Sequence, residues 1–230
     1  MYDVEHNELI TAPQVKRPDL WETFPVFSPD GRTLYFTAAK KVEIPGELPQ
    51  SRYNLMKVSF DPETGTIGED VEMLVDAAAE GGSICFPKPS YDGRYLMYTL
   101  CDYGTFPIWH HESDLWLLDL ETGQRRRLDE VNSPDTDSYH NWSSNSRWFV
   151  FSSRRDDGLF TRLYIAHFGA DGVAGKPFLL PQRDPKNYYE DLFRSYNVPE
   201  FVTGPVPLDR IRAQKAINSS ERLPFGFRAP

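Results

Sequence analysis

The chain has 230 residues, 40% of them hydrophobic and 26% charged, which is enough for one large domain or two small ones with a buried core. Its longest apolar runs, 115–118 and 148–151, are far shorter than the ~20 residues of a membrane-spanning helix, so no membrane span is expected. Residues 1–181 hold 28 acidic and 17 basic residues, a net charge of −11, whereas 182–230 hold 6 and 8, a net charge of +2. Such an acidic body lacks the cationic surface that nucleic acids require, which excludes them as expected partners.

Three segments follow one pattern: a strand, a tight turn, and a second strand rich in aromatic and β-branched residues. The turns lie at 28–31, 90–93 and 143–146, and each is followed by an arginine. In the Ser-Pro-Asp-Gly form of the turn, proline fixes φ, aspartate caps the turn and glycine tolerates positive φ. Asn145-Ser146 replaces Asp-Gly in the third copy, and we expect asparagine to supply the left-handed residue there.

Two further strands are predicted after each hairpin. The third strands are 54–60, 114–120 and 162–168, and the fourth strands are roughly 71–75, 124–128 and 176–180. Four antiparallel strands in 40–60 residues are typical of a propeller blade, with an ordinary β-sandwich as the alternative. The predicted fold class is therefore all-β, with about three four-stranded blades (20–76, 82–130 and 136–181) in an incomplete ring, and a short helical or extended C-terminal tail.

The flanking segments, 1–19 and 182–230, determine how such blades are completed. Because propellers have 4–8 blades, we expect the chain to be the C-terminal part of a larger propeller, with 6–13 as the outer strand of a preceding blade. The alternative interpretations are that two copies close a ring, that the N-terminal strand pairs with the last blade, or that the blades form an open crescent with covered edges. In the tail, short helices are predicted at 186–196 and 208–217, and the remainder is expected to be extended. We expect the tail as a whole to cover an open blade edge.

The hairpins also carry a resemblance to a known family. Phe27 to Phe36 reads Phe-Ser-Pro-Asp-Gly-Arg followed by a strand, Ser90 to Tyr98 repeats this with Tyr for Pro, and Trp142 to Phe151 repeats it with Asn-Ser for Asp-Gly. These segments resemble the blade signature of the TolB-type propeller family over residues 20–181. The resemblance implies the propeller fold and a bacterial, periplasmic or cell-envelope location.

Propeller topology brings the longest loops, 39–53, 77–83, 101–113, 129–138 and 153–160, to one face. The binding residues predicted on this face are Trp109, His110, His111, Asp137, His140, Arg154, Arg155 and Asp156. Imidazoles beside carboxylates suit a divalent metal, which makes His110, His111 and His140 candidate ligands. The simpler interpretation is solvated or hydrogen-bonded histidines, so neither metal nor cofactor is predicted.

The paired arginines 154 and 155 allow two interpretations. Arginines clamp carboxylates bidentately, which favours a binding site, but a local salt-bridged turn closed by Gly158 is more usual. The two cysteines, Cys85 and Cys101, are too few for a disulfide framework, and their offset register predicts two free thiols.

No Gly-x-Ser-x-Gly motif is present, so no hydrolase domain of the kind that accompanies peptidase propellers is expected in these residues, and no catalytic residue is assigned. The leading hypothesis is a non-catalytic scaffold that binds a protein or peptide partner on its long-loop face, with self-association through open blade edges as a further possibility. The alternatives are a metal-dependent carbohydrate lyase or hydrolase similar to oligogalacturonate lyases, and the accessory propeller of a prolyl-oligopeptidase-like enzyme.

Overall fold

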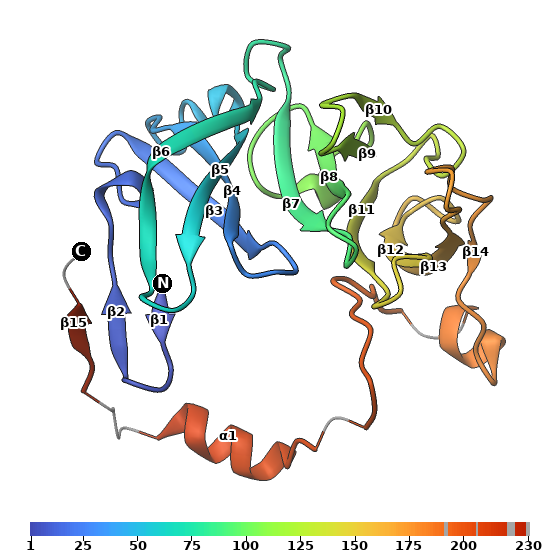
Figure 1. Cartoon of the computed structure of the whole chain (residues 1–230). Helices are drawn as coiled ribbons and strands as arrows, with labels where there is room; N and C mark the ends of the chain where they lie inside the picture. Colours follow the sequence, from blue (N-terminus) through green and yellow to red (C-terminus); the bar gives the residue numbers. More distant parts are fainter. Residues whose placement is uncertain (191–192, 206, 220–223, 229–230) are drawn as a thin grey trace.

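The computed structural model describes residues 1–190, 193–205, 207–219 and 224–228. Between residues 20 and 179 the chain forms three four-stranded antiparallel sheets along an arc (Figure 1). Each sheet uses four strands that are consecutive in the chain. They are β3 (Leu20–Phe27), β4 (Thr33–Lys40), β5 (Asn54–Asp61) and β6 (Thr66–Val75) in the first sheet, β7 (Ser83–Pro89), β8 (Tyr95–Cys101), β9 (Asp114–Asp119) and β10 (Arg125–Arg127) in the second, and β11 (Asp137–Trp142), β12 (Trp148–Ser153), β13 (Arg162–His167) and β14 (Phe178–Leu179) in the third. The predicted all-β fold with three blades is confirmed. In the described part of the chain the blades do not close into a ring.

The core lies between neighbouring sheets, whose first strands β3, β7 and β11 adjoin one another. Leu55, Ile84 and Tyr98 are buried between the first and second sheets. Trp142 and Phe168 are buried between the second and third, with their rings edge to face at 5.0 Å. The second strand of each sheet is almost wholly buried, which explains its aromatic and β-branched sequence.

Each hairpin turn is held by its serine. The Ser28 hydroxyl accepts the N–H of Thr33 at 2.9 Å and donates to Asp30 at 2.5 Å, and the other two turns repeat this arrangement. The third turn corrects one expectation, because the left-handed residue is Ser146 (φ 55°) rather than Asn145. Asn145 takes the capping position of the aspartate, and the Ser146 hydroxyl accepts the N–H of Asp92 at 2.9 Å from the neighbouring blade.

A bulge interrupts the first strand of every blade at the same place. The pairing slips by one residue between Thr23 and Val26 and at the matching points of the other two blades. The extra residue is aromatic and left-handed each time: Phe24, Phe86 and Tyr139 have φ of 51°, 53° and 51°. Their rings contact one another across the blades, with centroids 4.2 and 4.7 Å apart. This row of three rings joins the inner strands.

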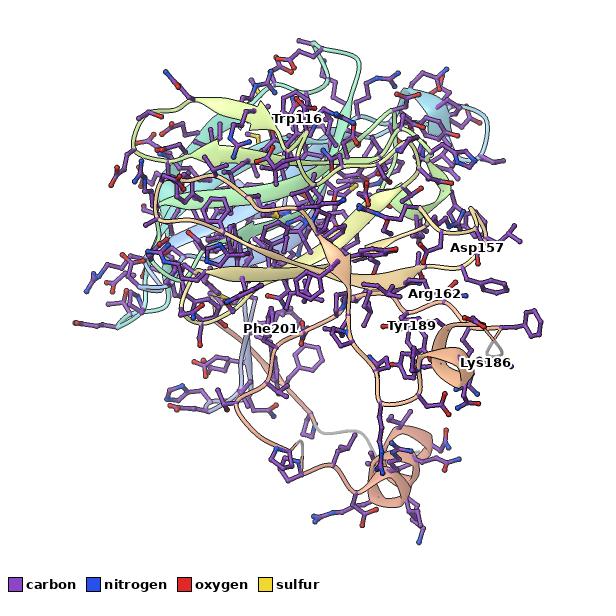
Figure 2. The ribbon with its side chains drawn as sticks, turned by 90° about the vertical axis from the view of Figure 1, so that its right-hand side faces the viewer. Trp116, Asp157, Arg162, Lys186, Tyr189 and Phe201 are labelled. Atoms are coloured by element: carbon purple, nitrogen blue, oxygen red, sulfur yellow. The ribbon has the colours of Figure 1, made fainter. Side chains whose placement is uncertain are left out.

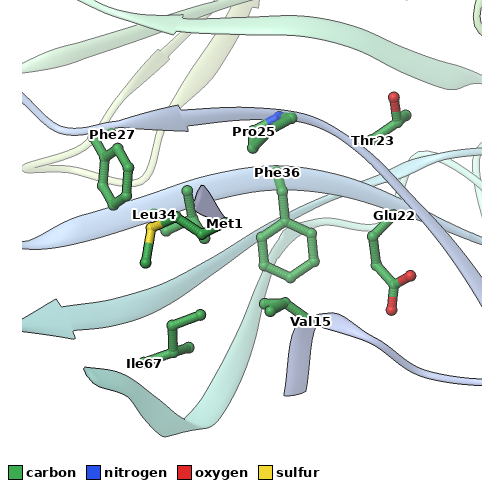
Figure 3. A pocket seen from close by; sticks show the side chains of 9 residues that line it. All are labelled: Met1, Val15, Glu22, Thr23, Pro25, Phe27, Leu34, Phe36 and Ile67. Atoms are coloured by element: carbon green, nitrogen blue, oxygen red, sulfur yellow. The ribbon is translucent and has the colours of Figure 1, made fainter. Parts of the chain in front are cut away.

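The N-terminal residues form a separate small sheet. Strand β2 (Glu8–Ile10) pairs antiparallel with β1 (Tyr2–Asp3) and parallel with β15 (Gly226–Arg228). The assignment of 6–13 to the outer strand of a preceding blade stays a prediction. Beside this sheet, a cavity of about 280 Å³ separates the N-terminal segment from the first blade, and Met1 and Val15 lie over Leu34, Phe36 and Ile67 there (Figure 3). The side of the first blade that has no neighbouring blade is thus incompletely packed.

The C-terminal tail runs across the open side of the third blade and returns to β2 (Figure 1). The helix predicted over 186–196 is a single π-helical turn, Lys186–Glu190, within the described residues, and 193–197 are not helical. The physical reason is a tertiary contact, since the N–H of Tyr196 donates to the Thr161 carbonyl at 3.1 Å instead of to a carbonyl of its own helix. The second predicted helix is α1 (Arg210–Asn218), which begins where the Asp209 carboxylate accepts the N–H groups of residues 211 and 212.

Candidate binding groove on the long-loop face

The long-loop face is the end of the blades formed by residues 41–53, 76–82, 102–113, 129–136 and 154–161. The antiparallel pairing explains why these loops meet. Lys40 at the end of β4 pairs with Leu20 at the start of β3, and Val75 at the end of β6 pairs with Leu55 near the start of β5. Loops that follow the second and fourth strands therefore emerge at the same end as the start of the first strand.

A groove of about 490 Å³ lies on this face between the first and second blades. Its apolar lining comes from Trp21, Ile44, Leu48, Tyr53, Tyr103, Phe106 and Trp109. Three of these side chains are largely exposed: Trp109 (72%), Phe106 (66%) and Ile44 (58%). An exposed cluster of this kind on a folded protein marks a binding surface more often than a chance patch.

Buried serines fix the floor of the groove. The N–H of Gly104 donates to the Ser51 carbonyl at 2.9 Å, and the Ser83 hydroxyl donates to the Gly104 carbonyl at 2.8 Å. Ser83 in turn accepts the N–H of Tyr53 at 3.1 Å. Gly104 adopts φ 71°, a conformation that side-chain-bearing residues rarely take. Loops from two blades are thereby locked together beneath the aromatic rings.

Trp109 stands at the end of a short 3₁₀ turn, Pro107–Trp109, whose first two residues are buried while the tryptophan projects outward. The next residue, His110, is fixed from two sides. The Thr136 hydroxyl donates to its carbonyl at 2.7 Å, and the Tyr103 ring lies edge-on to its imidazole with the ring centroids 4.6 Å apart. On the outer side, the Arg154 guanidinium lies 5.1 Å from the centre of the Trp109 ring.

The structure separates the eight predicted binding residues. Trp109, His110, His111, Arg154 and Asp156 lie on the long-loop face. Asp137 lies beneath it, fully buried, and forms an ion pair with Arg155 at 2.7 Å. His140 is 2% exposed inside the core, where its Nε2–H donates to the Met97 carbonyl at 3.0 Å. A partner on the surface cannot contact Asp137 or His140, and we leave both out of the binding surface.

The two neighbouring arginines differ in their partners. Besides Asp137, the Arg155 guanidinium bonds the Val131 carbonyl at 2.8 Å and the Ser153 hydroxyl at 2.8 Å, and it lies over Tyr164. The local salt-bridged interpretation therefore describes Arg155. Arg154 has no ion-pair or side-chain hydrogen-bond partner within the residues that the structure describes, and its Nε is buried without one.

The histidines proposed as metal ligands are each paired elsewhere. The ring of His110 contacts Glu112 at 2.7 Å, that of His111 contacts Asp135 at 2.9 Å, and His140 lies in the core. Among the residues described, no group of three or more His, Cys, Asp or Glu side chains is placed to hold a metal ion. The three imidazoles do not converge on one point.

Several lining residues were missed by sequence reasoning. Ile44, Leu48 and Tyr53 belong to a loop that topology had already assigned to this face, so their apolar character was an available signal. Trp21 lies within β3, and no local signal in its sequence separates it from a core position. Both cysteines are free, as predicted, and the structure buries both of them.

Across the described residues, no helix is both long and apolar enough to span a membrane. No protein-family model matches the sequence, and no curated protein matches it.

Solved structures do resemble the fold. A puromycin-hydrolysing peptidase from Mycobacterium tuberculosis matches 72% of this chain and 24% of its own at 17% identity, with a TM-score of 0.50. TolB from Acinetobacter baumannii matches 68% of this chain and 32% of its own at 20% identity, with a TM-score of 0.42. The propeller domain of the Trilobed protease from Pyrococcus furiosus matches 71% and 44% at 14% identity, with a TM-score of 0.40. The chain thus spans less than half the length of these proteins. The likeness to the peptidase, at a TM-score of 0.50, agrees with the propeller-type arrangement of the three four-stranded sheets.

Proposed function

We propose that the chain is a non-catalytic propeller scaffold that binds a protein or peptide partner in the groove of the long-loop face. One observation carries this proposal: exposed aromatic side chains, above all Trp109 and Phe106, stand on loops whose backbone is locked by buried hydrogen bonds. Tryptophan and other large apolar side chains dominate binding energy at interfaces, and a rigid scaffold loses little entropy when it binds.

The electrostatics of the face also favour binding over chemistry. The carboxylates of Glu112, Asp135 and Asp156 are engaged by His110, His111 and the Tyr164 hydroxyl. Burial, followed by the hydrogen bond to Asp156, raises the pKa of Tyr164 and keeps its phenol protonated. Groups held in such pairs serve mainly to order the loops. From the resemblance of its blade motifs to TolB we also propose a location in the periplasm or cell envelope.

Site-specific photo-crosslinking tests the proposal. A photoreactive phenylalanine analogue at position 106 is expected to crosslink a specific protein from a cell-envelope extract, and Trp109→Ala in the same chain should weaken that product at least tenfold. The matched control carries the analogue at Tyr91, an aromatic residue at the opposite end of the blades that is 56% exposed, against 66% for Phe106. Equal products from both positions, or none from position 106, would show that the groove is not the binding site.

A further inference from the structure

We infer that the groove binds an extended apolar segment of its partner and that Arg154 binds a carboxylate of that segment. The inference rests on the proposed function and names the chemistry of the partner. It starts from Trp109, which lines the groove and also lies 5.1 Å beneath the Arg154 guanidinium. The apolar site and the cation are therefore adjacent parts of one surface.

The backbone of Arg154 is held in place, and its guanidinium forms no ion pair or hydrogen bond with a carboxylate of the described residues, although its charge also acts on the nearby Asp157. The Arg154 N–H donates to the Thr136 carbonyl at 3.1 Å and its carbonyl accepts the N–H of Gly158 at 2.9 Å, so the backbone is anchored on both sides. The nearby carboxylates have other partners: Asp137 pairs with Arg155, Asp157 with Arg162, and Asp135 with His111. A guanidinium without a carboxylate, positioned over a tryptophan, is a ready donor of two parallel hydrogen bonds.

The lining of the groove favours apolar side chains over sugars as its occupants. Seven of its residues are aromatic or aliphatic, and two of its polar side chains are already engaged: the Ser51 hydroxyl donates to the Leu48 carbonyl at 2.7 Å, and the His110 ring contacts Glu112. An oligosaccharide would leave many hydroxyl groups without partners on such a surface, at a cost in free energy. Leucine, proline or aromatic side chains meet no such penalty, and aromatic grooves are the usual sites for extended apolar peptides.

Charge complementarity indicates that the bound segment carries a single carboxylate, which contacts Arg154. The protein has a net charge of −9, and the long-loop face carries exposed acids such as Glu43, Glu47 and Asp102. A strongly acidic partner is therefore repelled, whereas a single carboxylate at Arg154 is attracted. That carboxylate is either the C-terminus of the segment or an Asp or Glu side chain.

Selection from random peptides tests the inference with the full chain. Heptapeptide arrays are presented in two forms, one with a free C-terminal carboxylate and one amidated, so that the two sources of the carboxylate are distinguished. We expect the peptides that bind to combine apolar or proline residues with one carboxylate, from Asp or Glu on the amidated array. Binding should fall about 10- to 100-fold in Arg154→Met.

The matched control is Arg52→Met, which removes the same charge from the same face at a residue whose guanidinium bonds the Pro49 carbonyl. This variant should bind the selected peptides as the wild type does. Arg154→Glu should reverse the selection, so that lysine replaces the acidic residue. A purely structural role for Arg154 would not produce that reversal.

The remaining outcomes distinguish peptide binding in the groove from carboxylate binding by Arg154. If the selected peptides lose affinity in Trp109→Ala but not in Arg154→Met, the groove binds peptides and the carboxylate site is wrong. If they bind Trp109→Ala unchanged, the proposed function fails with it. Binding of a galacturonate oligomer in place of any peptide, or no binding at all, overturns both.

Discussion

His140 is a titratable side chain that the fold buries in the core. It is wholly buried between the second and third blades, and burial lowers its pKa from 6.5 to about 3. The folded protein therefore keeps a neutral ring where the unfolded chain gains a proton. Stability from this group is fully present above pH 6.5 and declines as the pH falls toward 3. Since one pKa unit corresponds to about 1.4 kcal/mol, the loss at pH 5 is about 2 kcal/mol.

We expect His140→Gln to unfold in urea with a shallower pH dependence between pH 7 and 5 than the wild type. Because other groups titrate identically in both proteins, the difference in slope isolates His140. In the wild type, the ring nitrogens should keep the chemical shifts of the neutral Nε2–H form down to about pH 4 by NMR. A ring that titrates near pH 6 would contradict the buried placement, whether or not the variant folds.

The buried thiols lead to a second prediction at this scale. Cys85 is fully buried, and burial, reinforced by its neighbour Cys101, raises its pKa well above the usual range. Because the thiolate is the reactive form, Cys85 is not expected to react with Ellman's reagent in the native protein, and burial keeps Cys101 from contacting the reagent. Both should react at once in urea. Rapid modification of one thiol without denaturant would show that the second blade opens locally.

Among the structural elements, the hairpin turns could be predicted from sequence and the inner-strand bulges could not. Ser28 and its counterparts carry the turn chemistry in their own side chains, so spacing alone locates the three blades. The bulge residues are aromatic, and nothing in their side chains indicates a positive φ. A bulge shifts the side-chain alternation by one residue, so the sequence pattern alone does not predict on which face of the sheet His140, just after the bulge at Tyr139, lies.

In the candidate site, too, some features could be predicted from the sequence and others could not. Trp109 and Arg154 could be assigned to the long-loop face because topology determines which loops meet there. The different roles of Arg154 and Arg155 could not, because they depend on which guanidinium reaches the buried Asp137. Trp21 joins the groove only through the packing of two blades that are separate in sequence.

One buried arginine, Arg162, takes part in attaching the tail to the third blade. The Arg162 guanidinium donates to the carbonyls of Tyr189 at 2.8 Å and Arg194 at 2.9 Å, and it contacts Asp157 at 3.5 Å (Figure 2). Arg162→Met is expected to release this segment, so that limited trypsin digestion cleaves near residues 183–194 at least several times faster than in the wild type.

Arg147→Met is the matched control, because it removes an arginine from the same blade at the opposite end, where the guanidinium bonds the adjacent Ser146 carbonyl. Its cleavage rate should equal that of the wild type. If Arg162→Met unfolds the whole chain, thermal denaturation will show a lower melting temperature for that variant. Unchanged digestion together with an unchanged melting temperature would mean that the arginine does not hold the tail.

At the scale of the whole molecule, the arc of blades has two open sides, and each is covered by a terminal segment. The N-terminal segment lies over the first blade beside the cavity in Figure 3, and the tail bonds along the third blade through Ser152 and Thr161. Open sheet faces and edges otherwise associate with other chains. The covering segments therefore favour a monomer near 26.5 kDa over ring closure by two copies.

Strand β15 links these two covers, because it pairs in parallel with β2 from Glu8 to Ile10 and donates the Gly226 N–H to the Asn7 carbonyl at 3.0 Å. Removing residues 224–230 leaves this edge of β2 unpaired and detaches the end of the tail. Light scattering should then show a mass that rises with concentration for the truncated chain and stays near 26.5 kDa for the intact one. A second variant lacks residues 200–204, which shortens the connection between the third blade and α1. If this variant also associates, β15 needs the full length of the tail to reach β2. An intact chain of twice the mass would show that two copies complete each other's open sides, and the tail would then belong to the interface between them.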